Sequence, residues 1–313
     1  MLVVKQETEA MNTAAINRHL PAATPGIALP DALPLVVLSL AVWTFRNHLP
    51  AWGFMWLLAG AIYAGCKWLT YSDAARHLPH PATRSLGYLL AWPGMDARAF
   101  FATDRVALTP TAKEWVGAWG KTLLGLGLLW LAAPWLADTS AVTAVWIGMV
   151  GLILTLHFGV FHLLSLAWRR AGVPAEPIMR APLFASSLSD FWSRRWNAAY
   201  HELAHRYAFR PLHRRIGTAG ATLAVFLLSG LVHDLVISVP ARGGYGWPTA
   251  YFGLHGAALL LERSPAGRAA GLGEGWRGRS FALAVCALPL GWLFHPPFVA
   301  NVIRPFLTAI HAL

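Results

Sequence analysis

Residues 219–239 read AGATLAVFLLSGLVHDLVISV, and this stretch decides the class of fold. An apolar run of about 20 residues is long enough to cross a lipid bilayer as an α-helix. Two ionisable residues, His233 and Asp234, stand side by side within the run. Because ionisable groups are costly to place in lipid, they are by default candidates for function. This stretch therefore predicts a transmembrane helix that carries a functional site.

The composition of the whole chain also favours a membrane environment. Of 313 residues, 56% are hydrophobic and only 12% are charged, whereas an average soluble domain is about 25% charged. We predict an all-α polytopic transmembrane bundle of about seven to nine spans, with a cytoplasmic N-terminal tail at residues 1–30 and one domain at residues 31–313. The candidate spans lie at residues 33–48, 51–70, 116–137, 141–167, 219–239, 247–262 and 280–297, with a further short apolar helix at 298–312.

The arginines predict the orientation of the chain. They gather in the loops after the second, fourth and sixth candidate spans, while the intervening loops hold chiefly Asp138 and Arg242. Cytoplasmic loops carry the excess of basic residues, so we expect a cytoplasmic N-terminus. The net charge of +11 suits anionic lipid headgroups or a phosphate-bearing substrate rather than nucleic acid. Abundant Ala, Trp and Arg with little Lys indicates a GC-rich bacterium, so we expect its inner membrane.

A second polar segment precedes this span. Residues 187–197 read SLSDFWSRRWN, and the span follows Asn197 after a further basic stretch. Within the span, Ser229 lies four residues before His233 and therefore on the same helix face. Gly230 is small enough for another helix to approach closely. These features predict a polar pocket in the membrane.

The two segments together resemble the wax synthases of the membrane-bound O-acyltransferase superfamily. The resemblance rests on residues 187–197 followed by Ser229-Gly230-Leu231-Val232-His233-Asp234, where Asp234 stands in place of the Glu that is usual in the plant enzymes. It implies transfer of an acyl group from acyl-CoA, as co-substrate, to a lipid alcohol supplied by the bilayer. It implies no permanently bound cofactor and no metal.

The resemblance also implies the site residues. His233 would be the general base, for which an imidazole is suited near neutral pH, and Asn197 the second catalytic residue. The substrate-binding set would comprise Asp190, Trp192, Arg194, Arg195, Trp196, Ser229 and Asp234. Several members have an alternative structural role. The arginines either bind coenzyme A phosphates or mark the cytoplasmic side, Asp190 is expected to cap a helix beginning at Phe191, and the tryptophans are expected to anchor at the membrane interface.

Other functions remain open in the sequence. The acceptor is first a long-chain fatty alcohol, with diacylglycerol, sterol-like or glycan hydroxyls as alternatives. A transporter with polar gating residues is a second class. The motif His201-Glu202-Leu203-Ala204-His205 matches H-E-x-x-H, in which two histidines one helical turn apart bind zinc. No third ligand follows at a familiar spacing, so an intramembrane zinc protease is the weakest of these hypotheses.

Overall fold

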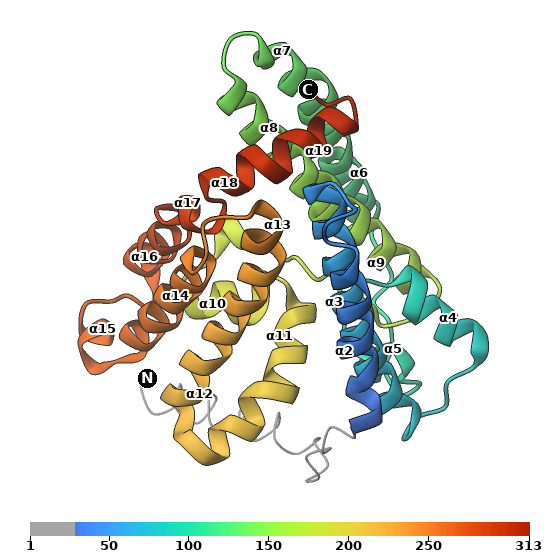
Figure 1. Ribbon diagram of the computed structural model, residues 1–313. Coiled ribbons are helices and arrows are strands. Elements are labelled where there is room, and N and C mark those ends of the chain that lie inside the picture. Colours follow the sequence, from blue (N-terminus) through green and yellow to red (C-terminus); the bar gives the residue numbers. More distant parts are fainter. Residues whose placement is uncertain (1–28) are drawn as a thin grey trace.

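The computed structural model describes residues 29–313, and every regular element in that range is a helix (Figure 1). The predicted all-α fold class is therefore confirmed for the described residues. The predicted tail at residues 1–30 lies almost wholly outside them. The grouping of residues 31–313 into one domain stays a prediction.

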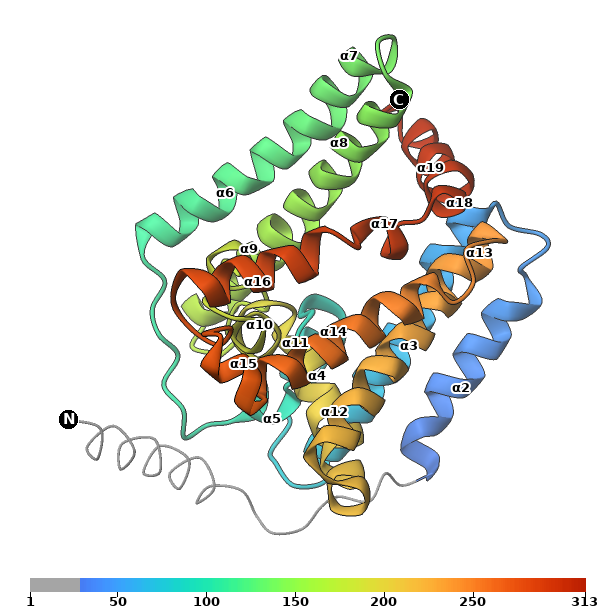
Figure 2. The same ribbon diagram turned by 90° about the vertical axis from the view of Figure 1, so that its left-hand side faces the viewer.

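Two helical pairs form the outer parts of the molecule (Figures 1 and 2). The first pair is α2 (Leu29–Thr44) and α3 (Ala51–Ala75). The second pair has one limb made of α6 (Ala112–Gly127), η1 (Leu128–Ala132) and α7 (Ala133–Ala137), and another made of α8 (Ala141–Ile153), η2 (Leu154–Val160) and α9 (Phe161–Arg170). A Cβ atom on Gly151 would lie 2.8 Å from the carbonyl oxygen of Gly125. Glycine at both positions thus lets the two limbs touch through their backbones.

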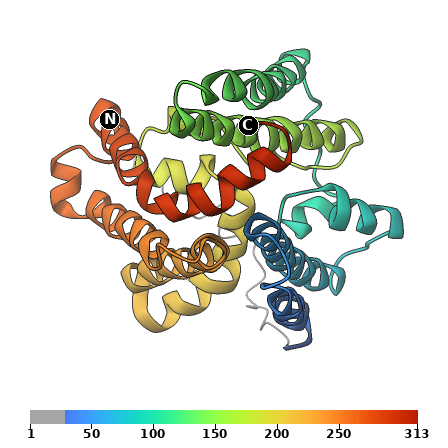
Figure 3. The ribbon, with the colours of Figure 1, turned by 45° about the horizontal axis from the view of Figure 1, so that its top comes forward.

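Two short helices connect these pairs, α4 (Ala82–Ala91) and α5 (Ala97–Phe101). The chain then passes from α9 through a compact segment with η3 (Pro182–Phe184), α10 (Leu188–Asp190) and η4 (Phe191–Arg195). In Figure 3 this yellow segment lies inside the molecule, between the green limbs and the orange helices. Residues 187–197, called the signature segment from here on, are therefore surrounded by helices.

A helical hairpin at residues 198–241 forms the centre of the fold. Its elements are α11 (Ala198–Ala204), η5 (His205–Phe209), α12 (Arg210–His233), η6 (Asp234–Ser238) and α13 (Val239–Ala241). Gly217 interrupts α12 with φ 69° and ψ 179°, a conformation that only glycine adopts readily. In Figure 1 the chain descends through α11, turns near the start of α12 and rises again. Residues 198–216 lie in the polar segment predicted between two spans, and in the structure they form a helical leg.

Proline residues explain most of the π-helical segments. Four of the six π segments among residues 29–313, η1, η5, η6 and η7 (Val299–Ile303), each end two residues before a proline. Proline has no N–H, and its ring clashes with the carbonyl four residues earlier. The wider π turn accommodates that ring, and such turns are frequent at functional sites. Of these, η5 begins at His205 and η6 directly follows His233.

The C-terminal third wraps the hairpin. Helix α14 (Trp247–Arg263) packs along α12, and a Cβ on Gly230 would lie 2.6 Å from the Cα of Thr249. The predicted close approach at Gly230 is thus confirmed. The remaining helices are α15 (Pro265–Ala269), α16 (Gly275–Ala287), α17 (Leu290–Leu293), α18 (Pro296–Phe298) and α19 (Arg304–Ala309).

Among residues 29–313, three helical stretches are long and apolar enough to cross a membrane by length and composition: Ala112–Ala137, Ala141–Arg170 and Ala198–Ala241. A pair bent by 60°, Gly275–Leu293 with Pro296–Ala309, makes a fourth if it is one span. The stretch Ala198–Ala241 is 44 residues long, but the break at Gly217 divides it into two legs. These apolar helices are typical of an integral membrane protein, and the count of seven to nine spans stays a prediction.

Candidate active site

Two side chains form hydrogen bonds with the backbone at the start of the signature segment. The hydroxyl of Ser187 accepts a hydrogen bond of 3.0 Å from the Asp190 backbone N–H and so caps α10. The carboxylate of Glu262, at the end of α14, accepts from the backbone N–H groups of Leu188 at 2.6 Å and Ser189 at 3.1 Å. The first N–H groups of a helix have no intrahelical partner. Glu262, which is only 3% exposed, therefore positions this segment, a role that was not predicted.

The carboxylate of Asp190 organises the rest of the segment. It accepts hydrogen bonds from the Ser186 backbone N–H at 3.0 Å, from Arg194 Nε at 2.9 Å and from Arg195 Nε at 2.6 Å. Burial raises the pKa of this carboxyl, but the Ser186 bond and the two guanidinium groups outweigh it and hold the pKa below its ordinary value. Asp190 makes no side-chain cap to the element beginning at Phe191. The prediction of that cap is therefore wrong.

Neither arginine of the signature faces the cavity described below. Both pair with Asp190, and Arg195 Nη1 also donates to the carbonyls of Arg180 and Ala181. The side chain of Arg194 is 73% exposed. Their predicted contact with coenzyme A phosphates stays a prediction.

Asn197 is presented by an unusual backbone conformation. Its φ of 47° and ψ of 62° lie in the left-handed region, where Asn is the best tolerated residue after Gly. The side-chain Oδ1 accepts a hydrogen bond of 3.2 Å from the Tyr200 backbone N–H and caps α11. Because the oxygen is turned to the helix, the amide Nδ2 points away from it. Asn197 thus presents a hydrogen-bond donor at the start of α11.

His233 is held in one tautomer by its own helix. Its Nδ1 lies 2.7 Å from the carbonyl oxygen of Ser229, one turn earlier. A carbonyl oxygen only accepts, so Nδ1 carries the proton and Nε2 keeps its lone pair. The ring of Phe252 packs against the imidazole with centroids 4.3 Å apart. His233 therefore has the state and the orientation that a general base requires.

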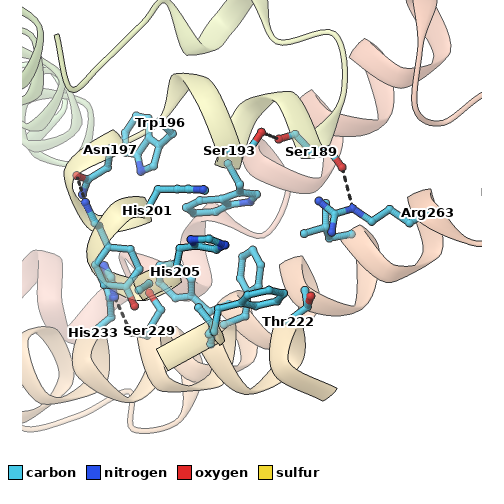
Figure 4. Close-up of a pocket in the computed structure, with 18 residues that line it drawn as sticks. Ser189, Ser193, Trp196, Asn197, His201, His205, Thr222, Ser229, His233 and Arg263 are labelled. Carbon is cyan, nitrogen blue, oxygen red and sulfur yellow. Dashed lines mark hydrogen bonds between the residues drawn. The ribbon is translucent and has the colours of Figure 1, made fainter. Parts of the chain in front are cut away.

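Asn197 and His233 line one cavity of about 360 Å³. Asn197 comes from the start of α11, and His233 comes from the end of α12, so the two legs of the hairpin supply opposite walls (Figure 4). The other lining residues are Ser189, Trp192, Ser193, Trp196, Tyr200, His201, Ala204, His205, Phe209, Thr222, Val225, Phe226, Ser229, Phe252, Leu259 and Arg263. The structure thus brings together both predicted catalytic residues.

Aromatic rings form much of the remaining wall. The Trp192 indole N–H donates to Nδ1 of His255 at 3.1 Å, and its ring meets Phe226 edge to face at 5.3 Å. Trp196 stacks on Phe191 with centroids 5.6 Å apart. Both tryptophans line the cavity, and their expected position at the membrane interface stays a prediction. Large apolar rings suit a ligand with a hydrocarbon chain.

Asp234 faces away from the cavity although it follows His233 directly. Its carboxylate accepts from the backbone N–H groups of Gly246 at 2.8 Å and Thr249 at 3.0 Å, and also from the Thr249 hydroxyl. The Ser238 hydroxyl donates to it at 2.8 Å. Asp234 therefore ties the start of α14 to the end of α12. Among the residues predicted to bind substrate, Asp190, Arg194, Arg195 and Asp234 are absent from the cavity lining, whereas Trp192, Trp196 and Ser229 are part of it.

The H-E-x-x-H motif is divided between two cavities. His201 and His205 line the cavity with His233, whereas Glu202 lines a second cavity of about 550 Å³ together with Asp96 and Arg105. In a zinc protease the glutamate activates water on the metal that both histidines bind. Within residues 29–313, no three His, Cys, Asp or Glu side chains are grouped to hold a metal ion. The motif therefore lacks the zinc-protease arrangement here.

Arg263 was assigned only to topology by the sequence, yet it lines the cavity. Its Nε donates to the Ser189 hydroxyl at 3.1 Å (Figure 4). The preceding residue, Glu262, holds the backbone of the same segment. A usable signal was the pairing of an acidic and a basic residue, Glu262 and Arg263, at the end of a predicted span. What that pair contacts lies 73 or 74 residues away in the chain, beyond any local pattern.

The segment that forms this cavity also matches a known family. Residues 175–254 match the model of the membrane bound O-acyl transferase family. This segment of the chain is thus similar to that family. The matched O-acyl transferase segment contains both Asn197 and His233 and the whole of the hairpin between them.

Several curated plant proteins are similar to this chain over part of its length. It is 32% identical over 141 residues to a long-chain-alcohol O-fatty-acyltransferase of Simmondsia chinensis, covering 42% of this chain and 40% of the relative. A probable long-chain-alcohol O-fatty-acyltransferase 2 of Arabidopsis thaliana is 33% identical over 147 residues, which is 42% of this chain and 41% of the relative. An acyl-CoA–sterol O-acyltransferase 1 of the same plant is 29% identical over 140 residues, 39% of each chain. The chain thus matches about two fifths of the length of these relatives.

Proposed function

We propose that the protein is a membrane-embedded O-acyltransferase that moves an acyl group from acyl-CoA to a long-chain fatty alcohol and so forms a wax ester. One observation carries the proposal: Asn197 and His233 face one cavity from the two legs of the central hairpin. The names of the similar plant proteins support the reaction class and the alcohol acceptor.

The first step is attack by the alcohol. The lone pair on Nε2 of His233 takes the hydroxyl proton while the alcohol oxygen bonds to the thioester carbonyl carbon. The Ser229 carbonyl accepts from Nδ1–H and stabilises the imidazolium that forms. General-base assistance of this kind contributes about 10²–10⁴ in rate.

The second step is loss of the thiolate. Negative charge develops on the former carbonyl oxygen, and the Nδ2 amide of Asn197 donates a hydrogen bond to it. When the C–S bond breaks, the carbonyl re-forms, and the thiolate receives the proton from His233. The products are the ester and free coenzyme A, and no covalent acyl-enzyme is needed. An oxyanion donor is worth about 10²–10³ in kcat.

The two substrates would approach from different directions. The arginine-rich segments are proposed to lie on the cytoplasmic side, where acyl-CoA is available, and the alcohol would enter from the bilayer. We also propose a cytoplasmic N-terminus and a bacterial inner membrane. Protease or label accessibility of the predicted loops in oriented vesicles tests this topology.

A sterol is the second candidate acceptor. Similarity to an acyl-CoA–sterol O-acyltransferase supports a sterol as acceptor. The aromatic cavity wall would suit the ring system of a sterol as well as an alkyl chain. Diacylglycerol and glycan hydroxyls belong in the same acceptor panel. The identity of the product decides between these acceptors.

The decisive experiment uses membranes containing the full chain, radiolabelled palmitoyl-CoA and a panel of lipid alcohols. We expect a labelled ester with a fatty alcohol and acceptor-dependent release of coenzyme A. Failure to esterify any hydroxyl would refute the acyltransferase proposal. Flux of a solute without coenzyme A release would favour a transporter instead.

A further inference from the structure

His201 is a polar residue of the cavity that the proposed reaction does not yet use. Both of its ring nitrogens are buried and have no hydrogen-bond partner in the described structure. Buried polar groups almost always have a partner, so an unpaired one needs a specific explanation. Because the ring lines the same cavity as Asn197 and His233, the explanation is sought in a ligand.

The orientation of the His201 ring is set by its stacking on His205, the first contact in a run of four rings along one helix face. His201 lies parallel to His205 at 5.9 Å and 7°, and His205 lies on Phe209 at 5.5 Å and 18°. Phe209 in turn stacks on His213 at 5.6 Å and 10°. The first three rings line the cavity, and His213 does not. The ring of His201 is thus held in place by neighbours that leave its nitrogens free.

His201 also stands directly beside Asn197. The backbone N–H of His201 donates to the carbonyl of Asn197 at 3.0 Å, which closes the first turn of α11. Side chains four residues apart lie on the same helix face. In Figure 4 the rings of His201 and His205 extend from the α11 leg into the cavity, and His233 lies on the other leg. One wall therefore carries two adjacent polar groups, and the base lies on the other.

We propose that His201 is a second catalytic hydrogen-bond donor to the thioester carbonyl oxygen, next to the Asn197 amide; this inference rests on the proposed acyl transfer. A neutral imidazole has one N–H, which donates to the oxygen as the alcohol adds and negative charge develops there. The hydrogen bond weakens when the C–S bond breaks and the carbonyl re-forms. His201 exchanges no proton, since His233 takes the proton from the alcohol and returns it to the thiolate.

Two substitutions separate the donor from the ring stack. His201→Phe keeps an aromatic ring to stack on His205 and removes the N–H. His201→Gln loses the ring and keeps an N–H donor. We expect His201→Phe to lower kcat by about 10²-fold with little change in KM, because the bond forms chiefly in the transition state. We expect His201→Gln to retain kcat to within about tenfold.

His213→Ala is the matched control, because it removes an imidazole from the same stack outside the cavity, and we expect it to leave kcat unchanged. The assay is palmitoyl transfer to the best acceptor in membranes, normalised to folded protein. A wild-type rate in His201→Phe would overturn the inference while leaving the acyltransferase proposal intact. Equal inactivity of the Gln and Phe variants would also overturn it, since the basicity or the ring would then matter. A wild-type chain without transferase activity overturns both proposals.

Discussion

Two sets of polar residues differ in how far their hydrogen-bonding atoms are satisfied. We call Asp234 and Glu262, which bind the backbone beside the cavity, the frame, and His201 and His233, which line the cavity, the wall. In the frame, the carboxylates of Asp234 and Glu262 accept hydrogen bonds with both of their oxygens. In the wall, His233 keeps Nε2 free of its helix, and His201 has no hydrogen-bond partner at either ring nitrogen among residues 29–313. Satisfied buried groups specify a structure, whereas unsatisfied ones at a cavity await a ligand. The two sets of residues should therefore respond differently to substitution.

The largest effect is expected for His233→Ala. Removing the base should lower kcat by about 10²–10⁴-fold, while the melting temperature changes little, because the ring bonds only to a carbonyl of its own helix. The exposed His77→Ala is the control and should behave as the wild type. A His233→Ala protein that retains full turnover would remove His233 from the reaction.

Asn197 should show the next largest effect, and two variants separate its roles. Asn197→Gly keeps the left-handed backbone but loses the amide, and Asn197→Asp keeps the capping oxygen but loses the donor. Both should lower kcat by about 10²–10³-fold. Thermal unfolding should leave Asn197→Asp close to the wild type. Full activity in the Asp variant would mean that the amide donates nothing to the reacting group.

A smaller effect on rate and a larger one on stability are expected for Asp234→Ala. The substitution leaves the N–H groups of Gly246 and Thr249 without their acceptor. We expect the free energy of unfolding to fall by roughly 3 kcal/mol, with less loss for Asp234→Asn, which keeps one acceptor oxygen. Thermal melting in detergent measures the change. If kcat per folded molecule of Asp234→Ala fell as far as that of His233→Ala, the division into frame and wall would be wrong.

The smallest effect is expected for Asp190→Asn, and it should depend on pH. The pKa of Asp190 is lowered in the folded state, so its ion pairs stabilise the fold above the unfolded pKa of about 3.9. That contribution is lost as the pH falls through the folded value. We expect the variant to be about 1 kcal/mol less stable at pH 7, since Arg194 is largely exposed. Melting curves from pH 7 to acid should show the gap narrowing, and a gap that widens in acid would contradict the assignment.

Local sequence determined the class of fold and the two principal site residues. Hydropathy is a property of a short window, so the apolar runs at 116–137, 141–167 and 219–239 correspond to helices in the structure. His233 stood out because an ionisable residue within an apolar run is rare. Asn197 was identified because its segment, residues 187–197, resembles the corresponding segment of the wax synthases. Gly230 was recognised as a point of close approach because only its size matters there.

Only the tertiary structure decided which way these residues face. Successive helical residues are about 100° apart, so His233 and Asp234 had to point in different directions, but only the packing of α14 assigns the cavity to one and the frame to the other. The left-handed turn at Gly217 folds residues 198–209 back along α12 and brings His201 into the cavity. Glu262 reaches a segment 74 residues earlier. Such contacts depend on how whole helices pack, which no short window of sequence records.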